Sequence, residues 1–287
     1  IERINSLNKG KPARHIPVIP EKPVWEEYIR HEDYAELLRS KQYLPNGYDA
    51  VTAAYSSINL ESLLTYAICG TRKSGKTTYM KTLIRAAVDK SSEVAVIEIG
   101  SYEFVQIAET TGCRYITDGQ GIYDYAKNVL LEEAGRRAKK KTECLSSHME
   151  DWEIFEAMME YKRHCIFIPN MPGFLKELYN HDSVAYNAAG VYETLVGEKG
   201  FHYNFYFFAE INDSDVADIL GYRLMQGFKG NGTGIHFGGK YLSQKFFSFA
   251  NIPYKNQSTP LKPGIGVVPS EDENAPLEQI VVPNYKG

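Results

Sequence analysis

The chain has 287 residues, of which 43% are hydrophobic and 24% charged; this composition is typical of a globular protein and excludes a disordered chain. Lysine plus arginine total 32 against 36 aspartate plus glutamate, a formal net charge of -4, so the cationic excess of a non-specific nucleic-acid-binding protein is absent. No apolar run approaches the roughly 18 to 20 residues that a membrane-spanning helix needs.

The first 24 residues carry four prolines and little periodicity, which predicts an extended linker. The chain opens at Ile1 without a signal-peptide pattern, so we expect the linker to come from an upstream part of a longer polypeptide. Apolar residues at helical spacing predict a helix over Trp25 to Ser40. The alternating run that follows predicts a hairpin with its turn at Asn46-Gly47.

From Leu63 onward, apolar strands alternate with amphipathic helices. We expect strands at 63–70, 93–100, 113–118, 164–169 and 203–211, and helices over 75–88, around 122–130, around 152–159 and from 182. Such alternation is typical of an α/β fold with a mostly parallel sheet flanked by helices. The Met and aromatic stripes of these helices, Trp152 included, are expected to pack in the core. Short strands and a hairpin around the acidic loop 270–274 are expected near the C-terminus.

Cysteine usage indicates the compartment. The four cysteines have no C-x-x-C spacing and lie in or near apolar or helical patterns, which is typical of reduced thiols in a cytosolic protein. They are Cys69, Cys113, Cys144 and Cys165.

Residues 70–77, GTRKSGKT, match the phosphate-binding pattern G-x-x-x-x-G-K-[ST] between a predicted strand and a predicted helix. Glycines let the loop wrap a phosphate, and the helix start points positive dipole at it. Lys76 would reach the outer phosphates and Thr77 would offer its hydroxyl to Mg²⁺. We therefore expect ATP and Mg²⁺ as cofactors, with occupancy open, and Thr77 as the metal ligand. The expected binding residues are Gly70, Thr71, Arg72, Lys73, Ser74, Gly75, Lys76, Thr77 and Thr78.

Hydrolysis also needs a carboxylate at the end of a strand to hold Mg²⁺ through its shell and a group that orients water. The strand expected to supply them ends in Asn170 and Met171 and has no carboxylate. Two other strands end in an acid, Glu98 and Glu210. Either acid could serve as a substitute, or could instead face solvent or a neighbouring Arg.

Five segments together resemble the FtsK/SpoIIIE group of P-loop motor ATPases, and most closely the C-terminal ATPase domain of the EssC type VII secretion motors of Firmicutes. The resemblance runs from about Ile16 to the C-terminus. Besides the phosphate loop, LEEAGRR resembles the E-x-E-R-R helix, CIFIPNMPGFLKEL the Walker B strand, GEKGFHYNFYFFAE the G-R-x-x-G-I-H strand ending in Thr-Gln, and LKPGIGVV the closing L-x-G-x-G-D segment. It implies a RecA-like P-loop NTPase fold and one ATPase domain over residues 25–287.

The departures from the family pattern predict a degenerate enzyme. Asn170 and Met171 replace the acidic pair, Glu198 stands near the expected Arg, and Ala209-Glu210 replaces Thr-Gln. One lost transition-state donor reduces turnover roughly 10²- to 10³-fold. We therefore expect ATP to bind weakly or not at all, expect little or no hydrolysis, and assign no catalytic residue.

The resemblance also implies partners and a location. Domains of this kind contact the upstream ATPase domains of the same polypeptide, recognise secreted small helical hairpin proteins, regulate their export and work in a hexameric machine linked to virulence. They lie at the cytoplasmic face of the plasma membrane, as soluble domains of a membrane-anchored protein. The high tyrosine content favours an exposed aromatic patch for such contacts, shaped by residues 227–239.

Two alternatives remain open at this point. The first is an active ATPase of the same fold that uses Glu98 or Glu210. The second is a DNA translocase module, against which the low net charge argues; no nucleic acid is expected. The basic run 136–141, RRAKKK, would suit DNA tracking or an arginine finger, but a solvated helix end is the simpler interpretation.

Overall fold

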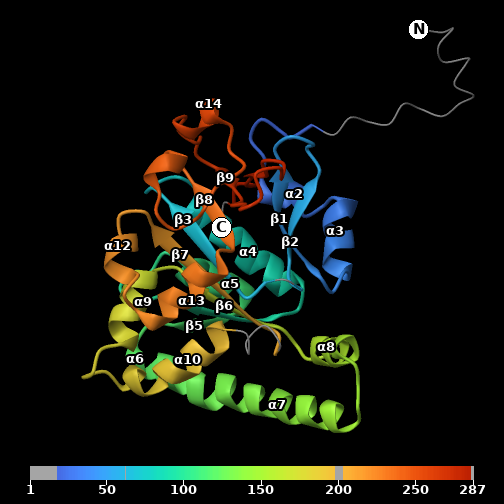
Figure 1. Cartoon of the computed structure of the whole chain (residues 1–287), viewed down its shortest axis with the longest axis vertical. Helices are drawn as coiled ribbons and strands as arrows, with labels where there is room; N and C mark the ends of the chain where they lie inside the picture. The colour runs from blue at the N-terminus through green and yellow to red at the C-terminus, as the bar shows by residue number, and fades with distance from the viewer. Residues whose placement is uncertain (1–17, 62, 198–202, 286–287) are drawn as a thin grey trace, which may run out of the picture.

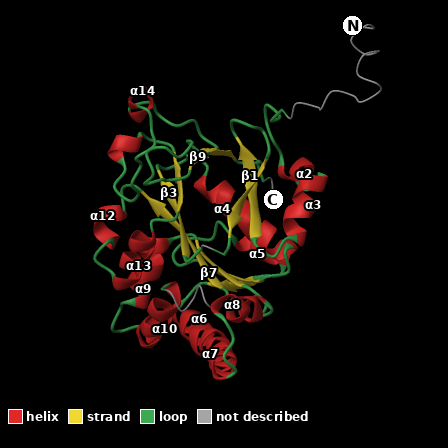
Figure 2. Ribbon diagram, turned by 45° about the vertical axis from the view of Figure 1, so that its right-hand side comes forward, coloured by secondary structure: helices red, strands yellow, loops and turns green. Residues whose placement is uncertain are grey.

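The computed structural model describes residues 18–61, 63–197 and 203–285. Ten strands form one sheet in the order β2-β1-β10-β9-β8-β3-β7-β6-β4-β5, and helices cover both of its faces (Figures 1 and 2). Strands β8, β3, β7, β6, β4 and β5 run parallel, whereas β9, β10, β1 and β2 extend the sheet antiparallel. The predicted α/β fold with a mostly parallel sheet is confirmed.

The strands are β1 (Tyr43–Asp49), β2 (Tyr55–Asn59), β3 (Thr65–Gly70), β4 (Glu93–Ile97), β5 (Arg114–Ile116), β6 (His164–Ile168), β7 (Phe205–Asn212), β8 (Gly234–Phe237), β9 (Ile265–Val267) and β10 (Gln279–Val281). The α-helices are α2 (Trp25–Tyr28), α3 (Glu32–Arg39), α4 (Lys76–Asp89), α5 (Val105–Thr111), α6 (Gly119–Tyr125), α7 (Leu131–Ser146), α8 (Asp151–Met159), α9 (Met171–Leu178), α10 (Ala189–Val196), α12 (Val216–Ile219), α13 (Arg223–Asn231) and α14 (Tyr254–Gln257). A π-helical turn, Ala126–Leu130, joins α6 to α7, and short 3-10 helices occur at Val184–Ala188 and Tyr241–Ser243.

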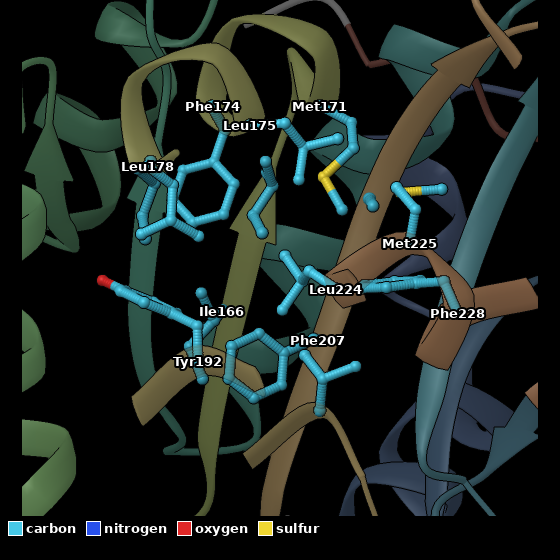
Figure 3. Close-up of a cluster of buried hydrophobic side chains, with 14 of the residues drawn as sticks. Ile166, Met171, Phe174, Leu175, Leu178, Tyr192, Phe207, Leu224, Met225 and Phe228 are labelled. Carbon is cyan, nitrogen blue, oxygen red and sulfur yellow. The ribbon is translucent and has the colours of Figure 1, made fainter. Parts of the chain in front are cut away.

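The parallel strands are apolar on both faces because each face supports its own core. In β7, Phe205 and Phe207 point into the core formed with α6, α9, α10 and α13, while Tyr206 and Phe208 point into the core formed with α4 and α5. Figure 3 shows part of the first core, where side chains of α9, α10 and α13 meet the sheet. This alternation decides which face each strand-end side chain occupies.

The N-terminal region differs from the sequence prediction in two places. The predicted helix over 25–40 is divided into α2 and α3. The predicted hairpin is present, but Asn46-Gly47 lies within β1, not in the turn. Glycine is required at position 47 because its φ is 143° and a Cβ there would lie 2.6 Å from the Val281 carbonyl oxygen of β10. The turn follows Asp49, whose Oδ1 accepts a hydrogen bond from the backbone N–H of Thr52 at 2.7 Å.

The aromatic residues mostly build the interior. Tyr28 is fully buried and its ring lies within 5.5 Å, centroid to centroid, of the rings of Trp25, Tyr34, Tyr48 and Tyr55. Part of the tyrosine content therefore serves packing between α2, α3 and the strands β1 and β2.

Two surface expectations are wrong. The segment 227–239 does not form an exposed aromatic patch, because Phe228, Ile235 and Phe237 are fully buried. Trp152, expected in the core, is 63% exposed on α8.

The predicted linker lies largely outside the described residues, which begin at Val18. Its last residue, Val24, pairs with Asn284 in a short bridge. Glu198 also lies outside the described part of the chain. No helix within the described ranges is long and apolar enough to cross a membrane.

Candidate nucleotide-binding site

The phosphate-binding pattern forms the connection between β3 and α4. Gly70 ends β3, residues 71–75 form the loop, and Lys76 begins the 14-residue helix α4. Gly75 has φ of 110°, and a Cβ there would lie 3.0 Å from the backbone nitrogen of Gly264, so glycine is required. The N-cap residue is Gly75, and no side chain of the described residues caps the N-terminus of α4. Its first N–H groups are therefore available to an anion, as in other phosphate loops.

Two distant glycine-rich segments hold this loop. Thr71 donates its backbone N–H to the Phe237 carbonyl at 3.1 Å, and Gly264 donates its own to the Ser74 carbonyl at 2.9 Å. A Cβ at Gly238 would collide with the Thr71 side chain. These contacts join segments far apart in the chain, and their signals in the sequence are the paired glycines after β8 and the Pro-Gly step before β9.

The nine expected binding residues all lie on this connection. Arg72 and Lys73 are exposed, Ser74 and Lys76 are buried, and the remaining five are glycines or partly buried threonines. The Ser74 hydroxyl donates to the Thr71 carbonyl at 2.7 Å. The Lys76 ammonium donates to the same carbonyl, also at 2.7 Å. Burial lowers the pKa of Lys76.

Glu210, two residues before the end of β7, lies directly against Lys76 and Thr77. The Thr77 hydroxyl donates to Glu210 Oε1 at 3.2 Å, and the same oxygen is 4.0 Å from Lys76 Nζ. The Glu210 side chain is 13% exposed. Burial raises the pKa of its carboxyl to about 7, an effect that Lys76 and Thr77 partly offset. Its Oε2 has no hydrogen-bond partner among the described residues.

The other strand-end acid, Glu98, is used in building the loop after β4. It is fully buried and accepts hydrogen bonds from the Ser101 hydroxyl at 2.6 Å and the Tyr115 hydroxyl at 2.6 Å. It also accepts from the backbone N–H groups of Glu103 at 2.9 Å and Phe104 at 3.1 Å. Because four donors already occupy this carboxylate, it stabilises the loop and is not free to bind a nucleotide or a metal ion.

At the end of β6, Asn170 and Met171 are likewise engaged within the fold. Asn170 is the N-cap of α9: its side-chain oxygen accepts from the Gly173 backbone N–H at 3.2 Å, and its Nδ2 donates to the Ile99 carbonyl at 2.5 Å. Met171 is fully buried, and Figure 3 shows its side chain directed into the core beside Leu175. Neither side chain is available to orient water on a nucleotide.

The basic run 136–141 lies within α7, not at its end, and Arg137 is not solvated. Arg137 is fully buried, with its guanidinium 4.5 Å from the Phe205 ring centroid and 5.2 Å from that of Tyr161. It donates to the carbonyl oxygen of Lys162 at 2.9 Å. Arg136 is exposed and pairs with acidic side chains of its own helix. Arg137 is therefore a structural residue, and the interpretation of a solvated helix end is wrong for it.

A second acid near the loop, Asp213, was also missed. Its backbone N–H donates to the Gly70 carbonyl at 3.0 Å, and its carboxylate contacts Nε2 of the buried His236 at 3.1 Å. This pair ties the end of β7 to β8 beside the phosphate loop.

The residues present fit a Mg²⁺-nucleotide. The glycine cradle and the open start of α4 suit phosphates, Lys76 suits their charge, and Thr77 with the unpartnered oxygen of Glu210 suits a hard cation that prefers oxygen ligands. The bound group would supply its phosphates as further metal ligands.

Comparison with protein-family models finds no match, and neither does comparison with curated proteins. Solved structures show the same fold. A structure of the cytoplasmic domain of EssC has 15% identity and a TM-score of 0.76, covering 99% of this chain and 52% of that one. The structure of EssC ATPases 2 and 3 from Geobacillus thermodenitrificans has 15% identity and a TM-score of 0.66, covering 99% of this chain and 49% of that one. The structure of Thermomonospora curvata EccC ATPases 2 and 3 in complex with a signal sequence peptide has 12% identity and a TM-score of 0.65, covering 97% of this chain and 46% of that one.

The expected resemblance is thus confirmed at the level of the fold, which is that of the type VII secretion ATPase domains. The chain spans about half the length of these three structures.

Proposed function

We propose that this chain is a C-terminal ATPase-type domain of a type VII secretion motor, with residues 25–287 as the domain, and that it binds ATP-Mg²⁺ weakly or not at all and hydrolyses little or none of it. The observation that carries this proposal is the contrast between two strand ends. At β3 the loop, Lys76 and Thr77 form a phosphate site, whereas at β6 Asn170 caps a helix and Met171 fills the core. Phosphate binding needs the groups at the end of β3, and hydrolysis also needs acidic groups at the end of β6.

The domain would then act through protein contacts. Its partners would be upstream ATPase domains of the same polypeptide and secreted small helical hairpin proteins, within a hexameric motor at the cytoplasmic face of the membrane. Two observations support this: the chain spans about half the length of its structural neighbours, and one of them, EccC, was solved with a signal sequence peptide. The net charge of -4 gives no support to a nucleic-acid partner.

The test is phosphate release by the purified chain with ATP and Mg²⁺, compared with Lys76→Ala. We expect no difference between the two, because no side chain at the end of β6 orients water. Steady release that disappears in Lys76→Ala would contradict the proposal. It would favour the second candidate function, an active motor domain, for which the contact between Glu210 and Thr77 is the specific observation.

A further inference from the structure

We propose that Glu210 replaces the missing acid of β6 as the protein carboxylate that holds Mg²⁺ beside Thr77. The proposal rests on the nucleotide site proposed above and goes beyond it, because it moves the metal-binding acid from β6 to the neighbouring strand. It predicts a site that holds a Mg²⁺-nucleotide without the means to hydrolyse it.

The sheet topology brings Glu210 to the loop. Strand β7 lies between β3, which leads into the loop, and β6. Along β7, Tyr206 and Phe208 point to the face that α4 covers, and by the period of two Glu210 points to the same face. The last paired residues of β6 and β7 are Ile168 and Ala209. Glu210 therefore lies one residue beyond the end of β6, at the edge where acids of parallel strands meet a loop-bound phosphate.

The hydroxyl of Thr77 lies in contact with the Glu210 carboxylate. In a phosphate loop the hydroxyl at this position binds Mg²⁺. Here it donates to Glu210 Oε1 at 3.2 Å, so both oxygens can reach one small cation with little movement. Mg²⁺ is usually held by one or two carboxylates together with substrate phosphates and waters, and these two side chains supply the protein's share.

The second carboxylate oxygen of Glu210 is open to a ligand. Glu210 is largely buried, and its Oε2 has no partner among the described residues. Leaving a buried charged oxygen unpaired is costly. Lys76 does not meet this need, because its ammonium donates to the Thr71 carbonyl and stands 4.0 Å from Oε1. A divalent cation between Thr77 and Glu210 would give this oxygen a partner.

The neighbouring acids do not compete for this role. Glu98 accepts four hydrogen bonds from the loop after β4, and the Asp213 carboxylate contacts His236. The Asp215 carboxylate accepts from Asn212 Nδ2 and the Ser214 hydroxyl. Among these described acids, Glu210 combines contact with Thr77 and an open oxygen.

Mn²⁺ is the probe for the test, because free Mn²⁺ is counted by electron paramagnetic resonance without any turnover. The full chain is titrated with Mn²⁺ at AMP-PNP equimolar with protein, as wild type, Glu210→Gln and Glu103→Gln, and the Mn²⁺ bound by AMP-PNP alone is measured in a protein-free titration and subtracted. Glu103 is an exposed acid whose charge acts on Glu210, so its substitution removes the same charge without removing the proposed ligand. Nucleotide affinity is also measured, both with Mn²⁺ and in EDTA.

We expect Glu210→Gln to weaken Mn²⁺ binding tenfold or more, in line with losses at other metal sites, and to leave nucleotide affinity in EDTA unchanged or higher. Glu103→Gln should change Mn²⁺ binding less than twofold. Glu210→Asp keeps the carboxylate and should bind Mn²⁺ more tightly than Glu210→Gln, which separates ligation from a folding defect.

Three results would overturn the proposal: Mn²⁺ affinity within twofold of wild type in Glu210→Gln, an equal rise in nucleotide affinity with and without metal, or no Mn²⁺ bound by the wild type. These leave the proposed function standing if turnover is absent. Conversely, turnover that depends on Lys76, with Mn²⁺ still bound through Glu210, would refute the proposed function and retain this site.

Discussion

Replacing Met171 by Glu tests whether hydrolytic acids can be restored at β6. Met171 is fully buried in the core beneath α9. Losing its burial removes roughly 1.5–3 kcal/mol of hydrophobic stabilisation. A carboxyl placed there must stay protonated. Raising its pKa by 3 to 4 units above the ordinary Glu value of about 4.3 adds about 4 kcal/mol to the loss of stability at pH 7. The sum, on the order of 6 kcal/mol, is comparable with the stability of an entire small domain.

The assay is urea unfolding followed by circular dichroism, with Met171→Leu as the matched control. Leu conserves volume and polarity, so its loss should be under about 1.5 kcal/mol. Asn170→Asp is the companion variant at the cap. Asp caps helices as well as Asn does, but it loses the donation from Nδ2 to the Ile99 carbonyl, a loss of about 1 kcal/mol. We expect no gain of ATP turnover in either acidic variant.

An unfolding free energy of Met171→Glu within about 1 kcal/mol of wild type would refute this reasoning. It would mean that the side chain at 171 reaches solvent or the phosphate loop. A gain of turnover that depends on Lys76 would contradict the assignment of β6 as a structural strand end.

Two further predictions concern residues at the amino-terminal ends of β6 and β7, opposite the phosphate loop. Burial, together with the charge of Arg137, lowers the pKa of His164 to about 4, against opposing attraction from Glu93. The unfolded pKa is near 6.5, so stability is complete above pH 6.5 and falls by up to about 3 kcal/mol as the pH drops from 6.5 to 4. His164→Phe, followed by unfolding at each pH, should lose that part of the decline; an unchanged pH profile would contradict it. Arg137→Lys should destabilise the chain by about 2–4 kcal/mol in urea unfolding, since Lys cannot reproduce the stacked, multiply donating guanidinium. Arg136→Lys, at an exposed ion pair, should stay within about 0.5 kcal/mol, and equal effects of the two would refute the buried role.

Local patterns were enough to predict most of the parallel sheet and the phosphate loop. A strand, a glycine-rich turn and an amphipathic helix are specified by neighbouring residues, so Gly70 to Thr78 lies where the spacing predicts. The continuous apolar run of β7 likewise predicts a strand buried on both faces. The absence of a carboxylate at Asn170 and Met171 is visible in the sequence, and so is the expectation of weak hydrolysis that follows from it.

Other features depend on contacts between segments far apart in the chain, which no local pattern contains. Asn46-Gly47 has the composition of a turn, yet the approach of β10 places it inside a strand. Arg137 has the sequence context of a solvated helix, yet Phe205 and Tyr161 enclose it. Glu98 and Glu210 are equivalent in sequence, each ending an apolar strand. Strand order distinguishes them: β7 pairs directly with β3, whereas β4 is separated from it by β6 and β7. Only the tertiary structure therefore decides that Glu210 meets Thr77 and that Glu98 closes a loop, because pairing between strands is set by packing over the whole sheet.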